Sequence, residues 1–169
     1  MHGGAGSEMT VGNSGVRIRA YKARDAAQLR EVFMSSVHSL ASGFYTVEQL
    51  EAWAPATYDE SEWARKLATL RPFVATVDDQ AVAYADLQDS GYIDHFFVSA
   101  RFSGRGVGSA LMQRIHRAGI ASGVQSLWAD VSRSAEGFFL RHGFHLEYRQ
   151  TVLRRGVPLT NARMHRVLA

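Results

Sequence analysis

The sequence predicts a single α+β domain whose sheet mixes parallel and antiparallel pairing. The chain has 169 residues, of which 46% are hydrophobic, a size and composition that suit one compact domain with its own core. Its periodic segments follow the order strand, helices, antiparallel strands, helix, strand, helix, strands. No internal repeat or interior linker divides them, so we expect a tail over residues 1–15 and one domain over residues 16–169.

The beginning of the chain predicts one strand followed by a helix. Residues 1–15 are rich in Gly and Ser and lack periodicity, so we expect them to be disordered. Val16–Tyr21 alternates apolar side chains with Arg, which is typical of a strand. Asp25 and Gln28 have the spacing of a capping box, and apolar residues then recur at helical spacing as far as Leu40.

Two more short helices are expected before the central strands. The segment Thr46–Gln49 has the pattern of a helix start, and Pro55 bounds the helix that follows. Asp59–Glu62 has the same pattern and begins a helix that ends before Pro72, because proline cannot continue a helix. The first strand is therefore followed by a run of helices.

Three apolar runs then predict an antiparallel meander. Phe73–Val77 and Ala81–Leu87 are separated by Asp78–Gln80, which has the composition of a tight hairpin turn. Gly91 precedes the third run, Tyr92–Val98. We expect these runs to pair in sequence order.

Helices and strands alternate in the rest of the chain. A Gly-rich stretch, residues 104–108, leads into a helix that Gly123 ends, and Ser126–Val131 is the next strand. Ala135–His142 is a short helix that Gly143 ends. The chain closes with two strands, Phe144–Leu153 and Val157–Val167.

The composition excludes several classes of protein. The chain has no cysteine, which excludes disulfides, thiolate metal sites and cysteine nucleophiles. No apolar run approaches the roughly 20 residues that a membrane helix needs. The first residues lack the basic start and apolar middle of a signal peptide, so we expect a cytoplasmic protein with no membrane partner.

The net charge of +3 is an average over two unlike halves. Residues 1–99 hold 8 Lys and Arg against 13 Asp and Glu, a net charge of −5, whereas residues 100–169 hold 11 Arg against 3 Asp and Glu, a net charge of +8. A basic half indicates a nucleic acid or a phosphorylated small molecule, or only a solvated surface. Because the arginines cluster beside the Gly-rich stretch and near the chain end, without interleaved aromatic strands, we expect no nucleic-acid partner.

The strand, Gly-rich turn and helix over residues 92–122 form the most informative pattern. Glycines let the backbone turn its amides inward, and the helix start adds unpaired N–H groups, so such a turn suits a pyrophosphate. A nucleotide P-loop would need Lys and then Ser or Thr after its last Gly, but Ser109 follows Gly108. The dinucleotide fingerprint also fails, because its third Gly would fall at Ser109 or Leu111.

Two motifs resemble those of the GNAT superfamily of acetyl-CoA-dependent N-acetyltransferases. In that family a strand ends in an apolar residue, and after a short link Arg/Gln-x-x-Gly-x-Gly/Ala opens a helix; here Val98 ends the strand and Ser103–Gly108 occupies the pattern. A second signature, Asn-x-x-Ala-x-x-apolar-Tyr-x-x-x-Gly-Phe, corresponds to Ser132–Phe144. The order and separation of both fit, and the resemblance extends from Val16 to Val167.

The resemblance implies a three-layer α/β/α fold whose mostly antiparallel sheet contains a central splayed pair of strands. It also implies acetyl-CoA as the co-substrate, and we expect no metal. The Gly-rich turn would hold the pyrophosphate, and the strand before it would pair with the pantetheine arm. The implied cofactor-binding residues are Phe97, Val98, Ser103, Gly104, Arg105, Gly106, Val107, Gly108, Ser109 and Ser132.

Three positions depart from the family pattern. Ser103 stands where Arg or Gln is usual, and Arg101 and Arg105 could compensate for the lost interaction with the pyrophosphate. Ser132 replaces an Asn that contacts the cofactor arm. Phe139 replaces the Tyr that protonates the departing thiolate in many relatives, which leaves water or another side chain as the acid, the candidates being Tyr84, His142, His145 and Tyr148.

The candidate bases lie just before the expected splay. Asp94 and His95 are adjacent on one strand and therefore point to opposite faces. Relatives often carry Glu at the positions of Tyr92 and Asp94, so the resemblance makes Asp94 the first choice of general base, acting through water. His95 is the second, because its unperturbed pKa suits neutral pH. A solvated carboxylate and a packed imidazole are the alternative interpretations.

The resemblance places the acceptor site on the helices before residue 72. Aromatic and imidazole groups gather there, which suits an apolar or cationic amine, although the same residues could simply pack the helices. The acidic balance of residues 1–99 also favours a cationic acceptor. Phe44 and Trp63 belong to this group, and the candidate substrate-binding residues are His38, Tyr45 and Trp53.

Together, these patterns predict an N-acetyltransferase that moves an acetyl group from acetyl-CoA to a primary amine of a small molecule or peptide, by direct attack on the thioester. The departures at Ser103 and Phe139 leave a second hypothesis, a non-catalytic acyl-CoA-binding sensor with the same fold. The sequence identifies neither the acceptor nor the oligomeric state, and it leaves a homodimer open.

Overall fold

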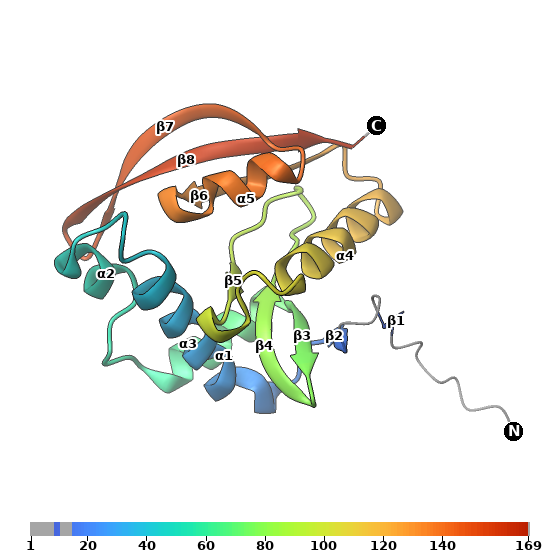
Figure 1. Cartoon of the computed structure of the whole chain (residues 1–169), viewed down its shortest axis with the longest axis horizontal. Coiled ribbons are helices and arrows are strands. Elements are labelled where there is room, and N and C mark those ends of the chain that lie inside the picture. Colours follow the sequence, from blue (N-terminus) through green and yellow to red (C-terminus); the bar gives the residue numbers. More distant parts are fainter. Residues whose placement is uncertain (1–8, 11–14, 169) are drawn as a thin grey trace, which may run out of the picture.

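The computed structural model describes residues 9–10 and 15–168 (Figure 1). We expect residues 1–8 and 11–14 to be disordered, and these residues lie outside the described part of the chain. Within the expected tail, Met9–Thr10 form a short strand, β1, which pairs antiparallel with β2, Val16–Ala20. Two residues of the expected tail therefore take part in the first sheet.

The first sheet is the expected meander, extended by the two N-terminal strands. Its order is β1-β2-β3-β4-β5, with antiparallel neighbours throughout. Between β3 (Phe73–Val77) and β4 (Gln80–Ala85), Asp78 and Asp79 both have positive φ, as a two-residue hairpin turn requires. β5 covers only Phe96–Val98, so most of the third predicted run lies outside the sheet.

A second sheet holds the last three strands, in the order β6-β8-β7. These are β6 (Ser126–Ser132), β7 (His145–Arg154) and β8 (Val157–Val167), and β7 and β8 form the long antiparallel pair at the top of Figure 1. The two sheets meet at one parallel bridge, between Tyr92 and Trp128, where the ring centroids are 4.3 Å apart. Towards β5 this pairing ends, which is the splay that the resemblance implied.

Helices cover both faces of the first sheet and confirm the three-layer fold. Val74 and Tyr84 join the core cluster of the N-terminal helices, whereas Ala75 and Ala83, one residue along each strand, join the cluster that contains α4. None of the helices in the described part of the chain is long and apolar enough to cross a membrane. The helices are α1 (Ala26–Ser35, continued by a wider turn over Ser36–Leu40), α2 (Val47–Trp53), α3 (Glu60–Leu70), α4 (Val107–Ala121) and α5 (Glu136–Arg141).

Local rules predict the starts of α2 and α3 correctly. The Thr46 hydroxyl accepts a hydrogen bond from the backbone N–H of Gln49, whose side-chain oxygen accepts from the N–H of Thr46. At α3, Asp59 Oδ1 accepts from the N–H of Glu62 at 3.0 Å. Each contact satisfies amides that a helix start leaves without a partner.

The expected capping box at α1 is wrong, because other partners take both side chains. The Asp25 carboxylate accepts two hydrogen bonds from the Arg19 guanidinium, at 2.7 and 2.8 Å, and another from the N–H of Lys22. Gln28 Oε1 instead accepts from the N–H of Ala81 in β4. A charged bidentate contact is stronger than a local cap, so the tertiary contact prevails.

The junction of the two sheets depends on Gly91. Its φ is +88°, and a Cβ at this position would collide with the backbone oxygen of Ser126. We predict that Gly91→Ala lowers the free energy of unfolding by more than ~3 kcal/mol, because the backbone must move as well as hold a left-handed conformation.

Urea unfolding measures this loss, and Gly123→Ala is the matched control. Gly123 also has positive φ, +76°, but open space around its Cα. Its substitution should cost only about 1–2 kcal/mol of backbone strain. Equal losses in the two variants would count against the role of Gly91 at the junction.

Candidate active site

The Gly-rich turn enters α4 through two residues of left-handed backbone. Gly104 has a φ of +73°, and Gly106, the N-cap of α4, has a φ of +82°. A side chain would be strained at both positions, so glycine is needed at each. The first amides of a helix have no partner within it and carry the positive end of its dipole. The start of α4 therefore offers a site for an anion.

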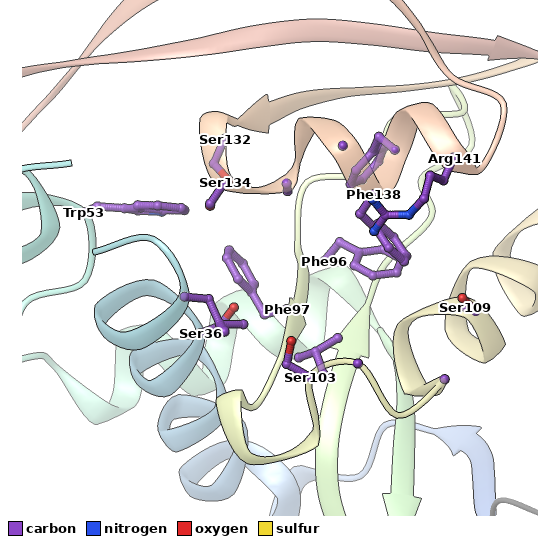
Figure 2. A pocket seen from close by; sticks show the side chains of 17 residues that line it. Ser36, Trp53, Phe96, Phe97, Ser103, Ser109, Ser132, Ser134, Phe138 and Arg141 are labelled. Carbon is purple, nitrogen blue, oxygen red and sulfur yellow. The ribbon is translucent and has the colours of Figure 1, made fainter. Parts of the chain in front are cut away.

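A cavity of about 550 Å³ opens beside this turn. Figure 2 shows that side chains from separate elements surround it: Phe96 and Phe97 from β5, Ser103 and Ser109 from the turn and α4, and Arg141 from α5. Further lining residues are Ser36, Leu40, Trp53, Val98, Gly104, Gly106, Ser132, Ser134, Ala135, Gly137, Phe138 and Phe139.

This cavity brings together most of the predicted cofactor-binding residues, namely Phe97, Val98, Ser103, Gly104, Gly106, Ser109 and Ser132. The other three, Arg105, Val107 and Gly108, do not line it. Val107 is buried in the core, and the Arg105 guanidinium lies 5.6 Å from the centroid of the Phe102 ring. Gly108 lets α4 approach α5, since a Cβ there would lie 3.2 Å from the Phe138 ring.

β5 presents an unpaired edge to the same cavity. It is the last strand of the first sheet, and β4 pairs with its other edge along all of Phe96–Val98. Within the described residues, the second sheet pairs only with the segment that precedes β5. There the N–H of Ile93 donates to the backbone oxygen of Trp128 at 2.9 Å. The free backbone groups of β5 suit an extended ligand that pairs like a strand.

A second cavity, of about 410 Å³, lies against α1 and α3. Asp94 and His95, the two candidate bases, both line it. Trp53 and Phe97 line this cavity as well as the first, so the two share a wall. The arrangement separates a place for an anion at the Gly-rich turn from a place for a second ligand beside Asp94.

The two candidate bases have different surroundings. Asp94 is partly exposed and forms an ion pair with Lys66, with Nζ 3.2 Å from Oδ2. His95 is only 8% exposed, and its Nδ1 is hydrogen-bonded to the Tyr84 hydroxyl at 3.0 Å. Burial lowers the pKa of His95 to about 4, although the Asp94 charge acts in the opposite direction. His95 is therefore a neutral, packed imidazole at pH 7.

A carboxylate that sequence reasoning missed fixes the backbone of both residues. Asp86 is fully buried, and its Oδ1 accepts hydrogen bonds from the N–H groups of Asp94, at 2.9 Å, and His95, at 2.7 Å. Gln88 donates to its other oxygen at 3.3 Å. Burial raises the pKa of Asp86, and the His95 N–H opposes that change. An Asp within an otherwise apolar strand run was the signal that could have revealed it.

The candidate acceptor residues are not all brought together. Trp53 lines both cavities. Tyr45 borders a smaller hollow, and its hydroxyl donates to the carbonyl of Thr160 at 2.6 Å. His38 lines neither large cavity, and its Nε2 lies 2.7 Å from the carbonyl oxygen of Ala54.

The side-chain candidates for a substitute acid are not among the residues that line the two large cavities, although Tyr84 and His142 contact lining residues. Tyr84 is fully buried, and His142 Nε2 lies 3.2 Å from the Ser109 hydroxyl. His145 and Tyr148 lie on β7. Phe139, at the position where relatives carry Tyr, does border the first cavity and is buried among other aromatic rings.

A glycine-lined helix start beside an open strand edge, in a sheet that splays, is the arrangement that the resemblance to the GNAT acetyltransferases implies. The Acetyltransferase (GNAT) domain family matches residues 42–166. The uncharacterized N-acetyltransferase YafP of Escherichia coli is 36% identical over 146 residues, which cover 86% of this chain and 92% of YafP. The chain therefore belongs to the GNAT acetyltransferase family.

Solved structures agree with this assignment. A GCN5-related N-acetyltransferase from Rhodopseudomonas palustris has a TM-score of 0.86 at 33% identity, covering 89% of this chain and 94% of that one. PaiA N-acetyltransferase from Thermoplasma acidophilum, solved in complex with coenzyme A, has a TM-score of 0.70 at 18% identity, covering 90% and 99%. YncA from Salmonella typhimurium, a structure with acetyl-CoA, has a TM-score of 0.65 at 18% identity, covering 91% and 94%.

The buried imidazole predicts a loss of stability in mild acid. The pKa of His95 is about 4 in the folded chain against the usual value near 6.5, so the unfolded chain binds more protons between these pH values. The contribution of the neutral His95 imidazole to the free energy of unfolding is complete above pH 6.5. It declines as the pH falls towards 4, by on the order of 3 kcal/mol.

Urea unfolding at pH 7 and pH 4.5, on the wild type and on His95→Gln, measures this contribution. The variant has no imidazole to protonate, so its free energy of unfolding should fall less between the two pH values. An equal fall in both proteins would show that His95 is not the responsible group.

Proposed function

We propose that this protein transfers an acetyl group from acetyl-CoA to a primary amine. One observation carries the proposal: the left-handed Gly-rich turn at the start of α4 and the unpaired edge of β5 border the same cavity of about 550 Å³. In this proposal the turn takes the pyrophosphate and the strand edge takes the pantetheine arm. The coenzyme A and acetyl-CoA complexes of two proteins with this fold support it.

The side chains around the first cavity fit such a ligand. Arg141 lines it, which adds a positive charge to that of the helix start. The hydroxyls of Ser132 and Ser134 also face it and lie 2.9 Å apart. These groups can hydrogen-bond to the amides of the arm and replace part of the interaction that an Asn makes in relatives.

The proposed chemistry proceeds by direct attack. A backbone N–H on the free edge of β5 polarises the thioester carbonyl, and Asp94 takes the amine proton through a water molecule. The amine nitrogen bonds to the carbonyl carbon, and the carbon–sulfur bond then breaks. The departing thiolate takes its proton from water, because Phe139 has no hydroxyl to donate.

The second candidate function is an acyl-CoA sensor without turnover. The observation that favours it is the buried Phe139, which packs its ring against Phe96 and Phe144 where relatives carry a Tyr. Both functions require acetyl-CoA to bind. Release of free thiol from acetyl-CoA that depends on an added amine is expected of the enzyme and not of the sensor.

A charge placed at the turn tests the cofactor site. Ser109→Asp puts a carboxylate in the first turn of α4, where it favours the helix but repels a pyrophosphate. We expect the variant to keep its stability and to bind acetyl-CoA at least ~10-fold more weakly than the wild type does. Calorimetric titration measures the affinity.

The control for this test is Ser109→Ala. It removes the hydroxyl without adding charge, and its affinity for acetyl-CoA should stay within about threefold of the wild-type value. If Ser109→Asp binds acetyl-CoA as tightly as Ser109→Ala does, the pyrophosphate does not lie on this turn.

Removal of the proposed base separates catalysis from binding. Asp94→Asn should lower kcat by about 100-fold or more, because general-base catalysis usually contributes that much, and should leave the Kd for acetyl-CoA nearly unchanged. Amine-dependent thiol release and calorimetric titration measure the two effects. Asp89→Asn, at an exposed position outside both cavities, is the control. Parallel losses of turnover and cofactor affinity would argue against the base role.

A further inference from the structure

Three of the arginines that line the second cavity form no ion pair with a carboxylate of the described residues. Arg30 of α1 and Arg154 and Arg155, at the turn between β7 and β8, all line it. Within residues 9–10 and 15–168, no carboxylate oxygen lies within 4.0 Å of these guanidinium groups. By contrast, Arg163 of β8 forms a bidentate pair with Asp130. The three arginines therefore keep their charge available for a ligand.

Arg30 is the strongest indication of a built site. It is only 7% exposed, and its guanidinium lies over aromatic rings, 4.1 Å from the centroid of Tyr58 and 5.0 Å from that of Trp63. One Nη donates to the carbonyl of Pro55 at 2.7 Å, whereas the buried Nε has no hydrogen-bond partner among the described residues. The guanidinium is thus a largely buried cation without a carboxylate partner among the described residues, a state that a bound anion would stabilise.

The turn between β7 and β8 brings two more cations to the same wall. Arg154 and Arg155 are exposed, and Arg155 holds a left-handed backbone with a φ of +48° while its Nη1 donates to the carbonyl of Ala52 at 2.6 Å. Burial is the largest cause that lowers the pKa of Arg30, and the charge of Arg155 lowers this pKa further. Two neighbouring cations stabilise one anion better than either alone.

Some of the carboxylates that line this cavity already have partners within the protein. Asp94 is paired with Lys66. The Asp59 carboxylate accepts the backbone N–H of Glu62 at the start of α3, and Glu62 also lines the cavity. Cations and carboxylates therefore lie together around this cavity, which Lys66 of α3 also lines, and Arg154 borders a smaller hollow together with Asp94.

We propose that the acceptor is a small amine that also carries a carboxylate, which Arg30, Arg154 and Arg155 bind while the amine faces Asp94. The proposal rests on the acetyltransferase function proposed above and specifies its second substrate. A volume of about 410 Å³ suits a molecule of amino-acid size. The guanidinium fork matches the two oxygens of a carboxylate.

This substrate class differs from the cationic acceptor that the charge of residues 1–99 favoured. That expectation treated the two halves of the chain as separate surfaces. The structure instead folds Arg154 and Arg155, from the basic half, onto a cavity whose other walls come from the acidic half. The charge around the second cavity therefore differs from the net charge of residues 1–99.

A binding experiment tests the anion site without turnover. Trp53 and Trp63 line the cavity and make tryptophan fluorescence a local probe. Wild-type protein is titrated with glutarate and with its neutral analogue glutaramide. We expect glutarate to bind at least ~10-fold more tightly, and Arg154→Gln to remove most of that preference. Arg149→Gln is the control, since Arg149 is an exposed β7 residue paired with Glu136 and should leave the preference intact.

Equal affinity for glutarate and glutaramide, or an unchanged preference in Arg154→Gln, would overturn the inference. A second measurement compares acetylation of 4-aminobutyrate with that of its amide, and the carboxylate should have a kcat/KM about tenfold higher or more. If the amide reacts as fast or faster while acetyl-CoA binds, the acceptor inference fails and the acetyltransferase function stands. If glutarate binds as expected but acetyl-CoA does not, the anion site stands and the proposed function fails.

Discussion

The separation of β5 from β6 is the constraint on which the rest of the candidate site depends. Among the described residues, the segment that leads into β5 meets β6 at one bridge, Tyr92 with Trp128, and β5 itself then diverges from β6. In the described structure, divergence leaves one edge of β5 unpaired beside the first cavity, and an open strand edge is suited to an extended ligand. It also opens the space that Phe96, Phe97 and Phe139 border. A sheet that continued without this gap would leave no room for a cofactor arm beside the Gly-rich turn.

Buried polar groups hold the residues on either side of this gap. The Asp86 carboxylate fixes the backbone of Asp94 and His95, which join the junction of the sheets to β5. The His95 imidazole then packs on Tyr84 in the core of the N-terminal helices and leaves Asp94 partly exposed at the second cavity. Asp94 and His95 precede β5 and both line that cavity, so the opposite faces expected of adjacent residues on one strand are not observed.

The sequence predicted the features that depend on neighbouring residues, and it missed those that depend on contacts between distant segments of the chain. The helix starts at Thr46 and Asp59 were predictable because the capping groups are three residues apart. The capping box at Asp25 failed because Arg19 lies within reach only after β2 is in place. At the site, the Gly-rich turn was predictable from its motif, whereas β5 covers only the last part of the predicted strand Tyr92–Val98. Asp86 and the cluster around Arg30 were not predictable, because their roles depend on partners far along the chain, and no spacing in the sequence records those contacts.

The central claim is that the start of α4 and the free edge of β5 bind one and the same ligand. Nuclear magnetic resonance of the backbone amides tests it most directly, by titration of labelled protein with acetyl-CoA. The account predicts that the amides of Gly106 and Ser109 and those of Phe97 and Val98 shift together and give the same Kd. Shifts confined to the turn, or shifts at neither element while the protein remains folded, would contradict it.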